Sequence, residues 1–196
     1  NGLIPRFYDG ELTGQVLIDG KDIADLTMYK IAEKVGSVFQ NPRTQFFNTD
    51  SDSEIAFGLE NQGMPTEELR QRVETTAADL EIQSLRNRSL HALSGGEKQK
   101  IALARVLYAD SDIIILDEPS GALDPIAEYT LNKTVTELSS DKTGIIISHR
   151  LSTTRFADKI YMLANGEIIE SGTHERLIKQ NGKYAEMFRL QAEKYR

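Results

Sequence analysis

Two stretches decide the fold: Leu-Ser-Gly-Gly-Glu-Lys-Gln at Leu93–Gln99, and Ile-Ile-Ile-Leu-Asp-Glu-Pro at Ile113–Pro119. The first opens a helical pattern that continues to Ala109, and the second is an apolar run that ends in two adjacent carboxylates. Such a run is typical of a strand buried in a parallel sheet. Because ligands of open α/β sheets bind at the carboxyl ends of the strands, we expect Asp117 and Glu118 to lie at a ligand site.

The chemistry of these residues fits a nucleotide triphosphate. Asp117 is suited to holding Mg²⁺, directly or through water, and Glu118 to taking a proton from an attacking water. Gly95 and Gly96 follow Ser94 at a helix start, where free N–H groups and partial positive charge favour a phosphate. Taken alone, each motif also has a plainer interpretation, namely two solvated acids and a Ser-Gly helix cap.

The composition describes an ordinary globular chain of 196 residues, with 39% hydrophobic and 27% charged residues. This length fits one domain, or one domain with a subdomain. The net charge is −7, so we expect no nucleic-acid partner. Cysteine is absent, which excludes disulfides and thiolate zinc sites. No apolar run approaches the ~20 residues that cross a bilayer.

Strand and helix patterns alternate through the second half of the chain. The strands are rich in β-branched residues, which predicts a mainly parallel sheet buried on both faces. The turn Asn165-Gly166 predicts a β-hairpin. The expected strands are Val35–Phe39, Asp112–Leu116, Gly144–Ser148 and Lys159–Leu163.

Helical patterns dominate the middle of the sequence, at Ser53–Asn61, Thr66–Leu80 and Gly96–Ala109. We therefore expect a division into an α/β core, formed by residues 1–45 and 112–196, and a helical subdomain formed by residues 46–111.

Together the motifs resemble those of the ATP-binding cassette (ABC) ATPases, in the same order along the chain. The resemblance implies a P-loop NTPase core with a mainly parallel sheet and an inserted helical signature subdomain. The matching segments are Val38–Pro42 (Q-loop), Leu93–Gln99 (signature), Asp112–Glu118 (Walker B), Ser120–Asp124 (D-loop) and Ile145–His149 (switch histidine).

The resemblance also implies a role for each matching residue. Glu118, His149 and Gln40 would be catalytic, and Asp117 with Gln40 would contact Mg²⁺. Asp124 would communicate across a dimer. The signature residues would bind the nucleotide held by the opposing subunit, and they are Ser94, Gly95, Gly96 and Gln99.

The chain departs from the family in lacking a phosphate loop. No Gly-x-x-x-x-Gly-Lys-[Ser/Thr] (Walker A) occurs in the 196 residues. Because the opening Asn1–Pro5 resembles the end of the helix that follows this loop, we expect a fragment that lacks Walker A and the N-terminal strands. Such a fragment is predicted to be inactive alone.

The two halves resemble different branches of the family. Gly2–Pro5, Val38–Phe47 and Glu54–Glu60 are similar to ATPases of energy-coupling-factor importers. Ser148–Thr153 and Gly166–Glu175 are similar to exporter-type cassettes. Natural recombination, design or an assembly artefact would each produce this pattern.

The resemblance implies an ATP-binding and ATP-hydrolysing subunit or domain that powers an ABC membrane transporter, with ATP and Mg²⁺ as ligands. Expected partners are a second ABC ATPase domain and transmembrane domains that dock at the Q-loop region, and the expected location is the cytoplasmic face of the membrane. One alternative is a non-enzymatic half-site that completes the site of another cassette. Another is a soluble, non-transport ABC ATPase, although Gln40 to Leu93 leaves no room for the coiled coil of the DNA-repair types.

Overall fold

The protein is described here by a computed structural model that covers residues 2–4, 6–61, 63–119, 125–138, 140–151 and 153–193, without the side chains of 125–127. The chain forms two compact units. Unit 1 consists of Asn1–Leu123 and Glu137–Ile147, and unit 2 of Asp124–Thr136 and Ser148–Arg196. The core and subdomain boundaries expected from the sequence stay a prediction.

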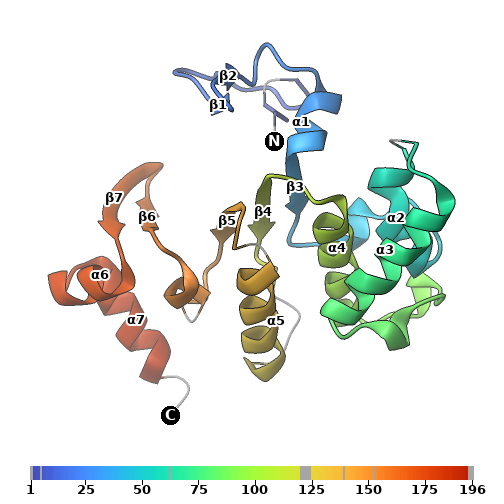
Figure 1. Cartoon of the computed structure of the whole chain (residues 1–196). Coiled ribbons are helices and arrows are strands. Elements are labelled where there is room, and N and C mark those ends of the chain that lie inside the picture. The colour runs from blue at the N-terminus through green and yellow to red at the C-terminus, as the bar shows by residue number, and fades with distance from the viewer. Residues whose placement is uncertain are drawn as a thin grey trace. The chain divides into compact units, whose positions relative to one another are not determined.

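Unit 1 is built on a three-stranded parallel sheet with the order β3-β4-β5 (Figure 1). The strands are β3 (Val35–Val38), β4 (Ile113–Asp117) and β5 (Thr143–Ile147). Both pairings are parallel, as the sequence predicts. In the central strand β4, Ile114 and Leu116 are buried, whereas Ile113, Ile115 and Asp117 are half-buried.

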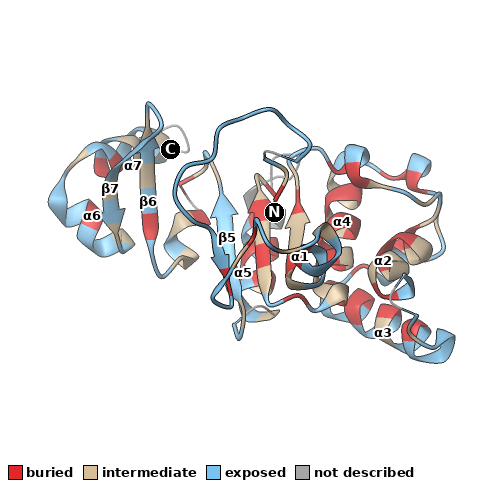
Figure 2. Ribbon diagram, turned by 90° about the horizontal axis from the view of Figure 1, so that it is seen from above, coloured by how far each residue is buried: buried red, intermediate tan, exposed pale blue. Residues whose placement is uncertain are grey.

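The expectation that every strand is buried on both faces is wrong for β5. All five of its residues are exposed, including Ile145, Ile146 and Ile147 (Figure 2). The reason is the position of β5, which in the described part of the chain pairs only with β4 and therefore forms an edge of the sheet. A β-branched run indicates a strand, but its burial depends on what lies beside the strand.

Three helices pack together in unit 1: α2 (Ser51–Glu60), α3 (Thr66–Asp79) and α4 (Gly95–Ala109). Their shared core is apolar, and the hydroxyl of Tyr108 in α4 donates a hydrogen bond to the carbonyl of Leu69 in α3 (3.3 Å). Burial raises the pKa of Tyr108. These contacts hold α4, which carries the signature motif, against two other helices.

Helix α4 also packs against β3. At Gly36, a Cβ atom would lie 2.6 Å from Cγ1 of Val106, a distance that side chains do not tolerate. Glycine at this position therefore lets helix and strand approach closely. The packing fixes the direction in which β3 delivers the residues that follow it.

The N-terminal part of unit 1 contains the short hairpin β1 (Leu17–Ile18) and β2 (Lys21–Asp22), followed by α1 (Met28–Lys34). Ile18, Ile23, Ile31 and Val35 form its buried cluster. The guanidinium of Arg6 donates to three main-chain carbonyls, those of Ile23, Ala24 and Leu26, at 2.6–3.1 Å.

Unit 2 contains most of α5 (Pro125–Leu138) and, after it, the antiparallel hairpin β6 (Ile160–Ala164) and β7 (Glu167–Gly172). Asn165 and Gly166, which form the turn, both have positive φ, so the predicted Asn-Gly hairpin is confirmed. The terminal helices are α6 (His174–Gln180) and α7 (Lys183–Glu193). A buried cluster of Leu151, Ile160, Leu177 and Tyr184 joins these elements.

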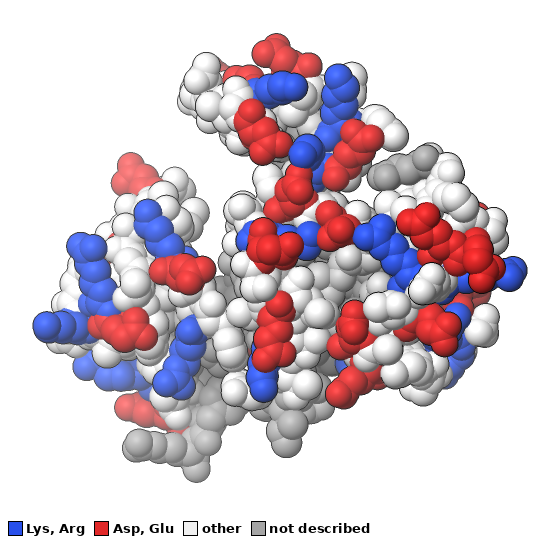
Figure 3. Space-filling view, viewed as in Figure 1, with Lys and Arg blue, Asp and Glu red and all other residues white. Residues whose placement is uncertain are grey.

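Short 3-10 helices connect several of these elements: η1 (Pro42–Gln45), η2 (Gln83–Leu85), η3 (Leu90–Ala92) and η4 (Thr153–Phe156). Within the described ranges, no helix has the length and apolar character needed to cross a membrane. Acidic and basic side chains are interspersed on the face drawn in Figure 3. The absence of a nucleic-acid partner stays a prediction.

Candidate active site

The carboxyl ends of β3 and β4 bring Gln40 and Glu118 together. Since the strands are parallel and Val38 is in register with Leu116, the residues that follow them emerge at the same edge of the sheet. The side-chain amide of Gln40 donates a 2.7 Å hydrogen bond from Nε2 to Oε2 of Glu118. Two residues that the sequence predicts to share a site are therefore in direct contact.

Glu118 is held in an uncommon backbone conformation at this edge. Its φ is 47°, and its main-chain N–H donates to the carbonyl of Ile147 at the end of β5 (2.8 Å). A left-handed conformation costs about 1 kcal/mol for a residue with a Cβ, so it is kept where the surrounding structure enforces it. The preceding residue, Asp117, is half-buried and in register with Ile147.

The oxygen atoms at this edge fit a magnesium ion that a nucleotide would share. Asp117 and Glu118 supply carboxylates, and Gln40, whose Nε2 faces Glu118, keeps its amide oxygen as a further ligand. Mg²⁺ is usually bound through one or two carboxylates, several waters and substrate phosphates. In the described part of the chain, no three or more His, Cys, Asp or Glu residues gather into a metal site of their own. The donor set therefore suits a shared ion and not an all-protein cage.

The signature residues form the start of α4, as predicted. Ser94 is the N-cap, and it makes a reciprocal capping box with Glu97. The Ser94 N–H donates to Oε2 of Glu97 (2.7 Å), and the Glu97 N–H donates to Oγ of Ser94 (3.3 Å). These bonds lower the pKa of Glu97, and the largest contribution comes from the backbone N–H of Ser94. In this chain Ser94 thus serves as a helix cap, and its contact with a partner's nucleotide stays a prediction.

Gln99 lies inside the helical packing. Only 2% of its surface is exposed, and within the described residues its Nε2 has no hydrogen-bond partner. The neighbouring Lys98 is also buried and donates from Nζ to the carbonyl of Leu93 (2.7 Å). A side chain as buried as Gln99 needs a rearrangement before it can touch a nucleotide, so its predicted role stays untested.

Two predicted site residues remain. Asp124 is outside the described residues, and His149 lies in unit 2. The main-chain carbonyl of His149 accepts a 2.7 Å hydrogen bond from Nε2 of Gln191 in α7. This contact ties the segment after β5 to the C-terminal helix within unit 2, and the catalytic role of the His149 side chain stays a prediction.

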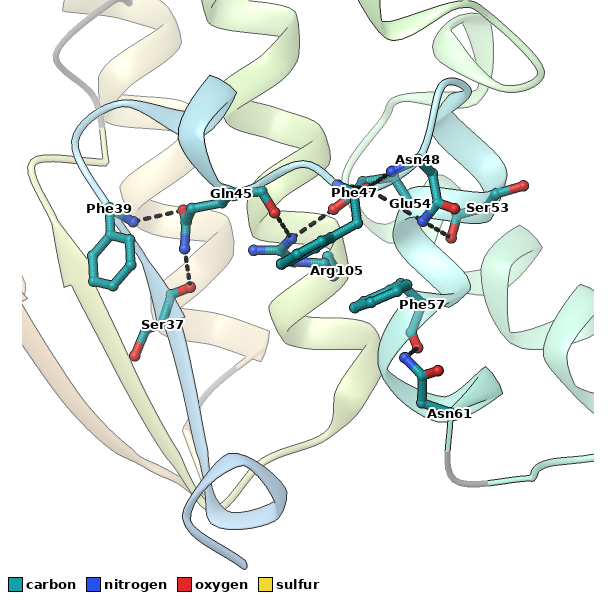
Figure 4. A network of polar contacts seen from close by, with 10 residues as sticks. All are labelled: Ser37, Phe39, Gln45, Phe47, Asn48, Ser53, Glu54, Phe57, Asn61 and Arg105. Atoms are coloured by element: carbon teal, nitrogen blue, oxygen red, sulfur yellow. Dashed lines mark hydrogen bonds and ion pairs between the residues drawn. The ribbon is translucent and has the colours of Figure 1, made fainter. Parts of the chain in front are cut away.

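Sequence reasoning missed a buried polar network beside the site, formed by Gln45, Glu54 and Arg105 (Figure 4). The signal was present in the helical patterns. Glu54 falls on the face of α2 that also carries the buried Ile55, and Arg105 interrupts an otherwise apolar run in α4. A lone acid and a lone base on apolar faces of two helices indicate a buried pair, since an unpaired charge there would be costly.

Comparison with known proteins identifies the family. A family model described as ABC transporter matches residues 4–121. The chain belongs to the ABC transporter family. The resemblance seen in the sequence motifs is therefore confirmed, and so is the α/β ABC ATPase fold.

Relatives of this ABC chain are found among curated proteins. A protein of Treponema denticola named as an ABC transporter ATP-binding protein is 48% identical over 170 residues, which cover 86% of this chain and 35% of the relative. The ATP-dependent lipid A-core flippase of Syntrophus aciditrophicus is 38% identical over 200 residues, which cover 96% of this chain and 32% of the flippase. The ABC chain thus spans about a third of the length of these relatives.

Two solved structures are similar to the ABC chain. One is a bacterial Atm1-family ABC exporter with ATP bound, with a TM-score of 0.78, 34% identity, and coverage of 92% of this chain and 32% of the exporter. The other is CbiO1 of Clostridium perfringens, part of the ABC transporter complex CbiONQ, with a TM-score of 0.75, 28% identity, and coverage of 92% and 76%. The chain is thus similar both to an exporter and to CbiO1, and the sequence motifs likewise resemble two branches of the family.

Proposed function

We propose that this chain is part of the ATP-binding and ATP-hydrolysing component that powers an ABC membrane transporter. The observation that carries the proposal is the contact between Gln40 and Glu118, which joins the ends of β3 and β4 beside Asp117. A general base must lie within hydrogen-bond reach of the proton that it abstracts. The 2.7 Å contact supports this role because it places the amide that would orient the water directly beside the carboxylate that would take its proton.

The chain's own residues would divide the chemistry as follows. Glu118 accepts the proton of the attacking water, Gln40 orients that water, and Asp117 supplies an oxygen ligand at the carboxyl end of β4. Bound Mg²⁺ would neutralise charge on the phosphate oxygens. His149, at the switch position, is proposed to hold the γ-phosphate, and Ser94, with Gly95 and Gly96, to bind it from the opposing subunit.

The proposed partners are a second ABC ATPase domain and transmembrane domains that contact the region after Gln40. With these partners the component would lie at the cytoplasmic face of a membrane. Phe47 in this region is 73% exposed and stacks on Phe57 of α2, with ring centroids 4.9 Å apart. An exposed aromatic residue held by a neighbouring ring is suited to contact another protein.

A second candidate function is a non-enzymatic half-site. In this candidate the chain supplies only its signature motif, whose Ser94 caps the N-terminus of α4, to the nucleotide of another cassette. In that case Ser94 would be required for the partner's hydrolysis, whereas Glu118 would not.

One experiment tests the proposal and separates the two functions. The chain is joined to an upstream segment that carries a phosphate loop, and phosphate release from Mg-ATP is measured. Hydrolysis that depends on Glu118 supports the proposal. A rate at the background of the unjoined chain, with stimulation of a separate cassette that depends on Ser94, supports the half-site and overturns the enzymatic role.

A further inference from the structure

A buried ion pair holds the loop that follows Gln40. The carboxylate of Glu54 in α2 is fully buried, and its Oε1 accepts a 2.6 Å hydrogen bond from Nη1 of Arg105 in α4. Its Oε2 accepts from the main-chain N–H groups of Phe47 and Asn48, each at 2.9 Å (Figure 4). A carboxylate so far from water is stable only when paired and hydrogen-bonded. The loop's own backbone supplies those bonds.

The same guanidinium reaches the beginning of the loop through Gln45. Nη1 of Arg105 also donates to the main-chain carbonyl of Gln45 (2.6 Å). The side chain of Gln45 in turn accepts from the N–H of Phe39 (2.9 Å) and donates to the carbonyl of Ser37 (3.1 Å). Arg105 is thereby connected to the end of β3, at the residue immediately before Gln40.

These contacts are more than the packing of α2 on α4 requires. The two helices already pack together, and each has a fully buried isoleucine, Ile55 in α2 and Ile101 in α4. The polar network adds bonds to the main chain at Gln45, Phe47 and Asn48, all in the loop between β3 and α2. What the network determines is therefore the position of this loop relative to α4.

We propose that Glu54, Arg105 and Gln45 are positioning residues that fix Gln40 relative to α4 and thereby determine whether its amide reaches Glu118. Because the signature residue Ser94 caps the N-terminus of α4, a displacement of that end of the helix would be passed through Arg105 to Gln40. The proposal rests on the proposed function only in that Gln40 and Glu118 act on a nucleotide. It makes the three residues a link between the signature motif and the attacking-water site.

The test uses nuclear magnetic resonance on the isotope-labelled chain without nucleotide. The reporter is the side-chain amide resonance of Gln40, assigned by its loss in Gln40→Leu. In the wild-type background, Glu118→Gln removes the charged acceptor, so we expect this resonance to shift. We call this shift the Gln40 response. When Glu118→Gln is combined with Glu54→Gln or with Gln45→Met, we expect the Gln40 response to be lost.

A matched control comes from the same helix. Asp52 of α2 also accepts from an arginine (Arg86, 3.0 Å) and from a main-chain N–H (Asn87, 2.9 Å). Among the described residues, no hydrogen bond joins its carboxylate to the loop between β3 and α2. Asp52→Asn should therefore keep the Gln40 response. Gln45→Met leaves the Glu54–Arg105 pair in place, so it decides the matter if Glu54→Gln does not fold.

The proposal is overturned if the Gln40 response persists in Gln45→Met and Glu54→Gln, if Asp52→Asn abolishes it equally, or if the wild-type chain shows none. ATP hydrolysis plays no part in this measurement. A response that persists in Gln45→Met and Glu54→Gln, or that Asp52→Asn abolishes, overturns this proposal and leaves the proposed function standing. A failure to hydrolyse ATP leaves this proposal standing.

Discussion

The side-chain amide of Gln40 donates a 2.7 Å hydrogen bond to the carboxylate of Glu118, although 78 positions separate the two residues. The contact exists because β3 and β4 are adjacent and parallel, so both residues emerge at the same edge of the sheet. It pairs a donor amide with a carboxylate, an arrangement that positions the carboxylate as a base while leaving the amide oxygen to a further ligand.

Replacing Glu118 by glutamine tests its role as the base. In a version joined to a phosphate-loop segment, we expect Glu118→Gln to lower ATP turnover about 10²–10⁴-fold, which is the usual contribution of general base catalysis. ATP binding should survive, because the amide keeps the shape of the carboxylate without its basicity. Glu67→Gln, at an exposed position in α3, is the control. A near wild-type turnover rate would remove Glu118 from this role.

Two substitutions of Ser94 separate its roles as helix cap and trans contact. In the same joined version, made hydrolysis-deficient, Ser94→Ala should lower the free energy of unfolding by about 1 kcal/mol through loss of the cap and still permit ATP-dependent dimerisation. Ser94→Arg should abolish the dimer but spare ATP binding by the monomer, because its side chain blocks the helix N-terminus. Light scattering with ATP measures the dimerisation of both variants. A dimer that persists in Ser94→Arg contradicts the trans contact.

Mg-ATP at millimolar concentration should leave the thermal midpoint of the 196-residue chain unchanged. The sequence holds no loop that would cradle the phosphates, and Asp117 and Glu118 repel an anion. A bound ligand would raise the midpoint by adding RT ln(1 + [L]/Kd) to the stability. Thermal unfolding with and without Mg-ATP is the measurement. A rise in the midpoint that Asp117→Asn removes would reveal a nucleotide site in this chain by itself.

The capping box predicts a defined acid dependence of stability. Hydrogen bonds from Ser94 hold the pKa of Glu97 below its ordinary value of 4.5. Glu97 therefore contributes stability above its unfolded pKa, and this contribution is lost as the pH falls through the lower folded pKa. The free energies of unfolding of the wild type and of Glu97→Gln should differ most at neutral pH and converge as the pH falls below the folded pKa of Glu97. A difference that stays constant with pH would mean that the charge of Glu97 is not involved.

Local patterns predicted most elements closely. Helical periodicity and the small residues at Ser94–Gly96 located α4 to within one residue. The Asn165-Gly166 turn located the hairpin because only such residues readily adopt its positive φ values. The capping box was also readable, since Ser94-x-x-Glu97 is its pattern.

Other features could not be read from the chain. The isoleucines of β5 look like those of β4 in the sequence, yet β4 has a strand on each side and β5 is exposed. The contact of Gln45 with Arg105, and that of Arg105 with Glu54, join residues 60 and 51 positions apart. No local periodicity encodes such partners, because they meet only after α2 and α4 have packed.

The sequence by itself determined the element types, the parallel sheet and the family, because backbone propensity and residue spacing act over a few neighbouring positions. It also indicated which side chains stand at strand ends, including Gln40 and Glu118. The tertiary structure alone decided that the side chains of Gln40 and Glu118 touch and that Ser94 bonds to its own helix. It also decided that a buried ion pair holds the loop between β3 and α2. The physical reason is that burial and long-range hydrogen bonds depend on which elements become neighbours.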